Sequence, residues 1–338
     1  MALKLNIKEF LKEALNSTLI DVRSPSEFHH GHIPGAKNLP LFSDAERKII
    51  GTLYTKKGKE ISIQKGFEIL AGKYSQLIEK IHSLSSDGVS YLYCWRGGMR
   101  SGAMSWLFER LDIKTYLLDD GYKSYRRLIR TYFSSPLHLI IVGGMTGTGK
   151  TEILEELQSR GFQVINLEKI AGHKGSAFGS LGEKQQPTTE QFENNLLVEF
   201  LKYDKAQPIF LENESQSIGR VFIPPELYQQ MKEAKLFNLE IPIDERIDRL
   251  VKAYSCYEDA QLMDCLHKIE KKIGGQNFKE AAFALKKKDY QKFARIALQY
   301  YDKSYRFGLE KKPRNNLIPI HSDTGNAKIN ADLIKKFL

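Results

Sequence analysis

Two glycine-rich segments hold the residues best suited to chemistry, and the first surrounds a cysteine. The segment Cys94 to Ser101, called the cysteine loop below, reads Cys-Trp-Arg-Gly-Gly-Met-Arg-Ser. Backbone N–H groups, the positive end of a following helix and two nearby arginines all favour a thiolate at Cys94. The loop predicts a cysteine nucleophile in an anion cradle built by Arg96, Gly97, Gly98, Arg100 and Ser101. A buried, inert cysteine is the alternative, but it would not call for two arginines and two glycines so close together.

The second segment is Gly144 to Thr151, called the phosphate loop below, and it matches the full pattern G-x-x-x-x-G-K-[ST]. Its glycines let backbone N–H groups wrap a phosphate chain, while Lys150 reaches the outer phosphates and the Thr151 hydroxyl can ligate Mg²⁺. The residues predicted to bind a phosphate chain are Gly144, Gly147, Thr148, Gly149, Lys150 and Thr151. The motif leaves the identity of the phosphorylated ligand open.

A run that ends in carboxylates lies further along the chain. Pro208 to Glu214 is predicted to be a strand with an acidic end, and Glu212 or Glu214 is a candidate to order a Mg²⁺ ion. The alternative is a strand followed by a solvated acidic turn.

The elements that position both loops alternate between strand and helix. A strand is predicted over Val89 to Cys94, with a helix over Ser101 to Leu111 after the cysteine loop. Another is predicted over Leu137 to Val142, with a helix over Glu152 to Arg160 after the phosphate loop. This alternation favours two α/β domains with parallel sheets. The expected division is 1–136, 137–264 and a basic, mainly helical region 265–338 that belongs to the second domain.

Length and composition agree with a soluble two-domain protein. The chain has 338 residues, of which 41% are hydrophobic and 27% charged. It lacks an apolar stretch of the ~18 residues that a membrane span needs, and Met1 to Leu15 carries charges where a signal peptide would be apolar, so we expect a cytoplasmic protein. The three cysteines are too few and scattered for a disulfide framework or a zinc site.

The net charge of +10 is unevenly distributed. Residues 1–136 hold 21 basic and 14 acidic side chains, residues 137–264 hold 13 and 20, and residues 265–338 hold 17 and 7. Two basic ends thus flank an acidic middle. This layout indicates either a polyanionic partner held by the ends or only a solvated basic surface.

The first part of the chain resembles a rhodanese domain. The resemblance rests on Asp21-Val22-Arg23-Ser24-Pro25-Ser26-Glu27-Phe28, on Gly31 to Pro40 (Gly-His-Ile-Pro-Gly-Ala-Lys-Asn-Leu-Pro), and on the cysteine loop. Five residues separate Cys94 from Arg100, the spacing of phosphatases with a cysteine nucleophile, whereas common sulfurtransferases have four. Against a phosphatase, Tyr93 stands where those enzymes usually place a histidine before the nucleophile.

The order of the two domains narrows the resemblance to the tRNA 2-selenouridine synthase family. Further segments that match this family are Gly51-Thr52-Leu53-Tyr54, Gly121-Tyr122-Lys123, Leu167-Glu168, His173 to Gly179, Gln186-Pro187, Phe192-Glu193-Asn194 and Tyr300-Tyr301-Asp302. The match extends from residue 18 to about residue 310. It departs from the family at Asp120, where a glycine is usual, and at Asn213, where an acid is frequent.

The resemblance implies a transferase that acts on the wobble uridine of tRNA. It implies that 2-thiouridine becomes 2-selenouridine through an S-geranyl intermediate, with geranyl diphosphate and selenophosphate as co-substrates. Cys94 would carry selenium as a perselenide, and the phosphate loop would hold a diphosphate, with Mg²⁺ on Thr151. The alternative is a P-loop kinase or NTPase, with ATP as its ligand, fused to a sulfurtransferase or a cysteine phosphatase.

The resemblance also assigns roles to residues outside the two loops. It implies that Glu168, His173, Lys174 and Ser176 orient substrate or act as acid and base, in a loop that follows a predicted strand over Val164 to Leu167. A structural histidine is the alternative there. A different observation concerns Lys286, Lys287, Lys288, Lys292 and Arg295, which lie on a predicted helical stretch that bears Tyr290, Tyr300, Tyr301 and Tyr305. Basic helices with tyrosines can bind the backbone of a tRNA and stack on its bases. Those tyrosines are either stacking surfaces or part of the core.

Overall fold

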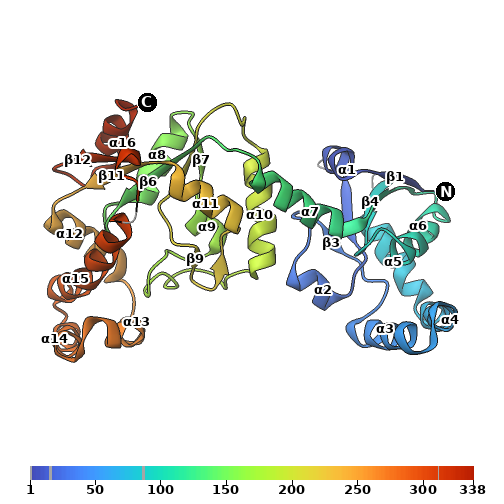
Figure 1. The fold of residues 1–338 in the computed structure, drawn as a ribbon. Helices are drawn as coiled ribbons and strands as arrows, with labels where there is room; N and C mark the ends of the chain where they lie inside the picture. Colours follow the sequence, from blue (N-terminus) through green and yellow to red (C-terminus); the bar gives the residue numbers. More distant parts are fainter. Residues whose placement is uncertain (1, 15–16, 86–87, 311) are drawn as a thin grey trace. The chain divides into compact units, whose positions relative to one another are not determined.

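The computed structural model describes residues 2–14, 17–85, 88–310 and 312–338. The chain divides into two compact units, residues 1–132 and 133–338 (Figure 1). In the described ranges, every helix is too short or too polar to span a lipid bilayer.

The first unit is built on a parallel sheet of five strands in the order β1-β5-β4-β2-β3. The strands are β1 (Leu3–Leu5), β2 (Thr18–Asp21), β3 (Lys37–Asn38), β4 (Val89–Tyr93) and β5 (Lys114–Leu118). The helices are α1 (Ile7–Ala14), α2 (Pro25–His30), α3 (Asp44–Lys57), α4 (Lys59–Ala71), α5 (Tyr74–Leu84), α6 (Met99–Glu109) and α7 (Gly121–Ser134). Parallel strands place the ends of β2, β4 and β5 at one edge of the sheet.

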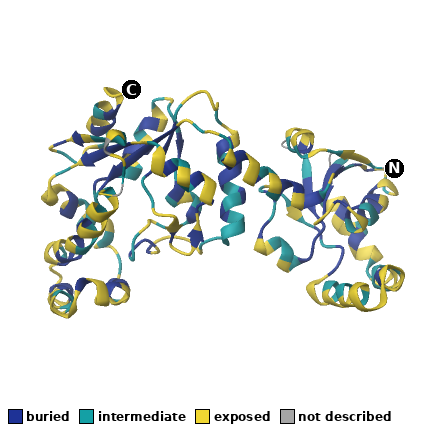
Figure 2. Ribbon diagram, in the orientation of Figure 1, coloured by how far each residue is buried: buried dark blue, intermediate teal, exposed yellow. Residues whose placement is uncertain are grey.

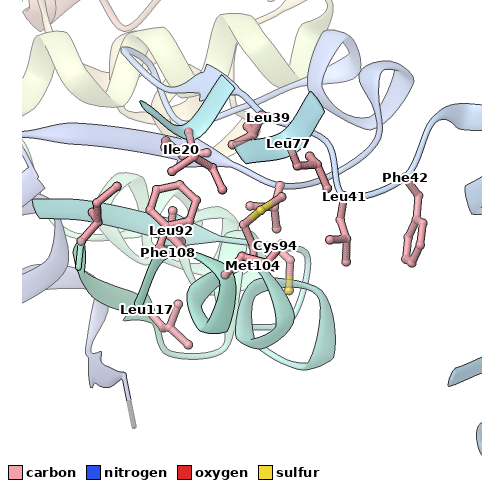
Figure 3. Packing of buried hydrophobic residues seen from close by; sticks show 14 residues of the cluster. Ile20, Leu39, Leu41, Phe42, Leu77, Leu92, Cys94, Met104, Phe108 and Leu117 are labelled. Carbon is pink, nitrogen blue, oxygen red and sulfur yellow. The ribbon is translucent and has the colours of Figure 1, made fainter. Parts of the chain in front are cut away.

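The core of this unit reaches the cysteine itself. Ile20, Leu92 and Phe108 are fully buried, and they belong to the same apolar cluster as Cys94 and Met104 (Figure 3). Close packing at the end of β4 therefore fixes the position of the sulfur before any ligand arrives.

The second unit contains another parallel sheet of five strands, in the order β12-β11-β6-β8-β7. The strands are β6 (Leu139–Gly144), β7 (Gln163–Ile165), β8 (Ile209–Glu212), β11 (Lys235–Glu240) and β12 (Leu317–His321), and a separate hairpin pairs β9 (Ser217–Ile218) with β10 (Val221–Phe222). β6, which leads into the phosphate loop, lies at the centre. All six of its residues are buried, as expected for a parallel strand covered on both faces.

Helices cover this second sheet and extend beyond it. They are α8 (Lys150–Ser159), α9 (Leu167–Ala171), α10 (Thr189–Leu201), α11 (Pro225–Glu233), α12 (Ile243–Tyr254), α13 (Asp259–Ile273), α14 (Gly275–Lys286), α15 (Tyr290–Leu309), a 3₁₀ turn η1 (Arg314–Asn316) and α16 (Ala327–Lys335). The helices α12 to α15 gather in one region of the unit (Figure 1). Each shows a buried stripe and an exposed one, the pattern of a helix packed on one side (Figure 2).

One predicted strand ends earlier than expected. The strand predicted over Val164 to Leu167 is confined to Gln163–Ile165, because α9 begins at Leu167. The Asn166 side chain caps this helix by accepting a hydrogen bond from the Lys169 N–H at 2.6 Å. Glu168 therefore lies on a short helix and does not follow the strand directly.

Substitution of Phe210 by alanine tests the importance of the second core. Phe210 on β8 is 0% exposed, so Phe210→Ala should lower the free energy of unfolding by about 3–5 kcal/mol. The matched control is Phe283→Ala on α14, where the ring is 60% exposed and the change should be small. Denaturant unfolding followed by circular dichroism measures both, and equal losses would contradict the assigned core.

Candidate active sites

Cys94 begins the cysteine loop and is almost fully buried, with 3% of the residue exposed. Its Sγ is 3.3 Å from the Ser101 Oγ, within hydrogen-bond distance. Burial alone would raise the pKa of the Cys94 thiol. Hydrogen bonds from the Ser101 hydroxyl and backbone, the Arg100 charge and a hydrogen bond from the Gly98 backbone outweigh burial, and the pKa is lowered. This is the electrostatic setting of a reactive thiolate.

The backbone around the cysteine is packed too tightly for side chains. A Cβ atom on Gly121 would lie 2.3 Å from the Cys94 carbonyl oxygen, and one on Gly97 would lie 2.5 Å from the Leu118 carbonyl oxygen. Both glycines have φ near +60°. The same carbonyl of Cys94 accepts a hydrogen bond from the Tyr122 N–H at 2.8 Å. The turn before α7 thus holds the base of the cysteine loop.

The two arginines of the cysteine loop have different surroundings. Arg100 donates to both carboxylate oxygens of Glu27, at 2.5 and 3.1 Å, and is largely covered. Arg96 is exposed. Arg100 is therefore a fixed charge held by Glu27, and Arg96 is the arginine free to move onto a ligand.

A buried ion pair between Arg23 and Asp21 lies next to the cysteine loop, and the sequence pattern did not assign it a role. Arg23 is 1% exposed, donates to the Asp21 carboxylate at 2.7 Å, and lies 4.0 Å from the ring centroid of Tyr122. Tyr93 is also buried, and its hydroxyl accepts a hydrogen bond from the Ile33 N–H at 3.1 Å. The Asp-Val-Arg motif and Tyr93 thus act as structural supports near the nucleophile.

The phosphate loop connects β6 to α8 in the conformation that its glycines predict. Gly147 and Gly149 have φ of +86° and +80°, values that favour glycine. A Cβ atom on Gly149 would lie 2.7 Å from the Arg249 guanidinium. Lys150 Nζ donates to the Gly144 carbonyl oxygen at 3.1 Å, and Thr151 Oγ1 donates to Glu168 Oε2 at 3.3 Å. All six predicted phosphate-binding residues lie in this one turn.

Two helices distant in sequence hold the phosphate loop in place. Arg246 on α12 donates to the Thr146 carbonyl oxygen at 3.1 Å and forms a buried pair with Asp302 on α15. On α15, the Tyr305 hydroxyl accepts from the Gly144 N–H at 2.7 Å and donates to Asn238. Tyr305 is half-buried, and its hydroxyl is engaged by the phosphate loop and by Asn238.

Three carboxyl groups gather beside Lys150 and Thr151. Burial raises the pKa of Glu212 to about 8, although the Leu167 N–H donates to its Oε2 at 2.7 Å. Burial, and next the neighbouring Glu168, raise the pKa of Glu214 to about 7. Glu168 itself has a raised pKa, chiefly through burial. Glu212 is thus a buried group and not a solvated turn, and its Oε1 has no hydrogen-bond partner among the described residues.

The segment after α9 forms a loop next to these carboxyl groups. The His173 Nδ1 accepts a hydrogen bond from the Gly175 N–H at 3.2 Å, and burial lowers the pKa of the imidazole. Lys174 forms an exposed ion pair with Glu183. A Cβ atom on Gly175 would lie 2.6 Å from Glu214 Oε2. The loop therefore brings His173 to Ser176 near the phosphate loop through Glu214.

The basic residues predicted to meet tRNA lie on an exposed corner of the second unit. Lys286 ends α14, Lys287 and Lys288 form the turn that follows, and Lys292 and Arg295 lie on α15. All five are exposed. Arg295 pairs with Asp244 at 2.7 Å, which leaves the lysines as the more available charges.

Comparison with known proteins identifies the family. The profile of the tRNA 2-selenouridine synthase AAA domain matches residues 137–327, and the profile of the rhodanese-like domain matches residues 7–128. The protein of this name from Shewanella frigidimarina is 38% identical over 273 residues, which cover 78% of this chain and 72% of that protein. The chain belongs to the tRNA 2-selenouridine synthase family.

Other members of the tRNA 2-selenouridine synthase family are similar over nearly the full length. The protein from Nitrosomonas europaea is 29% identical, with 92% of this chain and 93% of that protein covered. The protein from Shewanella sediminis is 34% identical, with 87% and 88% covered. The predicted family, the α/β fold with rhodanese-like and P-loop parts, and the assignment as an enzyme are confirmed.

The two departures from the family pattern have local explanations in the structure. Asp120 has φ of +58°, a conformation in which glycine is favoured and aspartate is tolerated. Its carboxylate pairs with Arg127. Asn213 directs its amide to the Tyr305 hydroxyl at 3.4 Å, so it contributes to the support of the phosphate loop.

Removal of the Ser101 hydroxyl tests the origin of the lowered thiol pKa. Ser101→Ala deletes a donor to the thiolate, so the Cys94 pKa should rise and alkylation by iodoacetamide at neutral pH should slow. The rate is measured against pH in a background with Cys256→Ser and Cys265→Ser. Ser105→Ala is the control, because Ser105 lies on the same helix as Ser101 and its buried hydrogen bond to Thr115 on β5 does not involve Cys94. An unchanged profile for Ser101→Ala would contradict the assignment.

Proposed function

We propose that this enzyme converts 2-thiouridine at the tRNA wobble position to 2-selenouridine in two steps, with geranyl diphosphate and selenophosphate as co-substrates. The observation that carries the proposal is the presence, in one chain of this family, of an activated cysteine loop and a complete phosphate loop. The first is suited to a selenium donor that contains phosphate. The second is suited to a diphosphate leaving group.

The phosphate loop performs the geranyl transfer. The 2-thio sulfur attacks the allylic carbon of geranyl diphosphate, a carbon–sulfur bond forms, the carbon–oxygen bond breaks, and diphosphate leaves with the electron pair. Lys150 and the N–H groups at Gly147 and Gly149 stabilise the charge that develops on the leaving oxygens. Lys150 reaches that position by exchanging its hydrogen bond with the Gly144 carbonyl for one with the ligand.

The residues around Thr151 fit a Mg²⁺ ion bound together with the diphosphate. The described residues contain no group of three His, Cys, Asp or Glu side chains placed to hold a metal on their own. Protein sites for Mg²⁺ need only one or two such groups when phosphate and water complete the shell. The Thr151 hydroxyl would hold the ion, and the unpartnered Glu212 Oε1 would orient its water. Bound there, the ion would neutralise charge on the diphosphate.

The cysteine loop performs the selenium transfer, and electron balance favours attack of Cys94 on phosphorus. The thiolate displaces selenium from selenophosphate, a sulfur–phosphorus bond forms, and hydroselenide leaves with the electron pair and a proton. Water then hydrolyses the phosphocysteine. A perselenide with phosphate as the other product needs a two-electron oxidant, which the co-substrates do not supply. The five-residue spacing from Cys94 to Arg100, typical of cysteine phosphatases, agrees with attack on phosphorus.

Hydroselenide then attacks C2 of the S-geranyl base, and geranyl thiolate leaves. Geranylation makes this exchange possible because a thiolate is a far better leaving group than the sulfur of an unmodified thiocarbonyl. The exposed lysines Lys286, Lys287, Lys288 and Lys292, with Arg295, hold the tRNA backbone during these steps.

Two substitutions separate the proposed steps. Lys150→Ala should slow geranyl transfer by about 10²–10³-fold yet still convert tRNA that already carries S-geranyl-2-thiouridine. Cys94→Ser should transfer the geranyl group normally but fail to replace it with selenium, so that the geranylated tRNA accumulates. Nucleoside mass spectrometry after incubation with tRNA, geranyl diphosphate and selenophosphate measures both. The matched controls are Lys169→Ala and Cys256→Ser, both at exposed positions. Normal geranylation by Lys150→Ala, or normal selenation by Cys94→Ser, would refute the corresponding site.

The adduct on Cys94 distinguishes the two routes of selenium transfer. With selenophosphate that carries radioactive phosphorus, rapid acid quench should trap the label on wild-type protein and not on Cys94→Ser, because the thiolate bonds to phosphorus. A peptide that contains Cys94 and shows the isotope pattern of selenium, without radioactive phosphorus, would instead establish the perselenide.

A further inference from the structure

An apolar pocket opens beside the phosphate loop within the second unit. Its empty volume, including the space at its opening, is about 520 Å³. Most of the lining comes from α12 and α15, which pack against each other, with Leu262 of α13 and Phe178 completing it. Thr146, the third residue of the phosphate loop, lies in the same wall. The pocket and the phosphate site are therefore adjacent.

The polar groups of the pocket are concentrated near the phosphate loop. The Ser176 Oγ accepts a hydrogen bond from the Phe178 N–H at 3.2 Å, and the Ser176 side chain lies beside the hydroxyls of Tyr254 and Tyr301. The Tyr301 hydroxyl also accepts from the Ala177 N–H at 3.1 Å. With Thr146, these groups form a polar mouth. The Ser176 and Tyr301 hydroxyls already accept hydrogen bonds from backbone N–H groups, so they have less capacity to hold water at the mouth.

The interior beyond this mouth is apolar, and its space depends on two small residues. Ala294 and Ala297 lie on the face of α15 that also presents Phe293 and Leu298, all of them buried. Larger side chains at the two alanines would fill the pocket. Tyr290 lies at the start of α15, about 16 Å along the helix from Tyr301, and donates to Asp259 at 3.0 Å. Tyr290 thus bounds the end of α15 remote from the mouth.

This arrangement selects a ligand with a phosphorylated head and an apolar tail. None of the lining side chains, all of which the structure describes, carries a formal charge, and the interior has few groups to bond a nucleotide base or ribose. An isoprenoid tail needs no hydrogen bonds and gains free energy from burial against Leu250, Phe293 and Leu298. We infer that the pocket binds the tail of an isoprenoid diphosphate, and that Ala294 and Tyr290 set the accepted chain length. The inference rests on the proposed geranyl transfer and names its tail site.

A ladder of diphosphates tests the inference on the full-length protein. The probes are inorganic diphosphate and the dimethylallyl, geranyl and farnesyl diphosphates, with one, two and three isoprene units, and affinity is measured by titration calorimetry. The wild type should bind geranyl diphosphate at least about tenfold more tightly than inorganic diphosphate. Ala294→Phe should lose this preference for geranyl diphosphate but bind inorganic and dimethylallyl diphosphate as tightly as the wild type does.

Two further variants make the result independent of whether Ala294→Phe folds. Tyr290→Ala should extend the pocket and raise the affinity for farnesyl relative to geranyl diphosphate. Ala253→Phe, on the exposed side of α12, is the control and should keep the wild-type order. If Ala294→Phe also fails to bind inorganic diphosphate, the tail site is judged from the relative affinities of Tyr290→Ala for farnesyl and geranyl diphosphate.

The outcomes separate the tail site from the proposed function. A wild type that binds geranyl and inorganic diphosphate equally, or variants that keep the wild-type chain-length order, would overturn the tail site even if geranyl transfer to tRNA proceeds. A wild type that transfers no geranyl group to tRNA would overturn the proposed function, whatever the order of affinities.

Discussion

The cysteine loop and the phosphate loop both depend on backbone segments that approach their neighbours more closely than a side chain permits. At Gly121 a Cβ atom would collide with the Cys94 carbonyl oxygen, and at Gly147 it would lie 2.9 Å from the Arg246 carbonyl oxygen. These contacts fix the loops before a ligand binds, so their N–H groups need little reorganisation when negative charge develops. Each unit has one parallel five-stranded sheet covered by helices, and this framework holds the glycine loop at the end of a strand.

Fixed charges near the two loops are mostly committed to internal partners. Arg23 is neutralised by Asp21, Arg100 by Glu27 and Arg246 by Asp302. Each of these ion pairs is wholly or largely covered, and each holds a loop or a neighbouring turn in place, so removal of one partner would leave a poorly solvated charge. Lys150 and Arg96 differ, because among the described residues Lys150 donates a hydrogen bond to a carbonyl oxygen and not to a carboxylate, and Arg96 is exposed. Residues 137–264 carry more acidic than basic side chains, yet they can still bind an anionic ligand. The raised pKa values of Glu212 and Glu214 reduce the negative charge beside Lys150.

Local motifs made much of this architecture predictable, whereas the supports for each loop come from distant segments. The order of strand, glycine loop and helix is encoded within about ten residues, so the fold class and the positions of both loops could be read directly. Glu27 is 73 positions from Arg100, and Tyr305 is 161 positions from Gly144, and no short-range pattern indicates such pairs. The helix at Leu167 was missed because Asn166 caps it within an apolar run that resembles a strand. The role of Tyr305 on α15 could not be predicted for a related reason: it depends on hydrogen bonds of the hydroxyl with Gly144 on β6 and Asn238 on β11.

The proposed reaction explains why one chain needs two sites of different character. Departure of diphosphate from an allylic carbon requires concentrated positive charge next to an apolar space that shields the geranyl group from water. Release of selenium from selenophosphate requires a thiolate within a ring of N–H donors, where a tetrahedral phosphoryl group is held. One pocket cannot meet both demands, because a thiolate beside an allylic diphosphate would itself be alkylated. In the proposed reaction, separate α/β units, each with a glycine loop at the end of its sheet, would keep the nucleophilic sulfur of Cys94 and the electrophilic carbon of geranyl diphosphate in different environments.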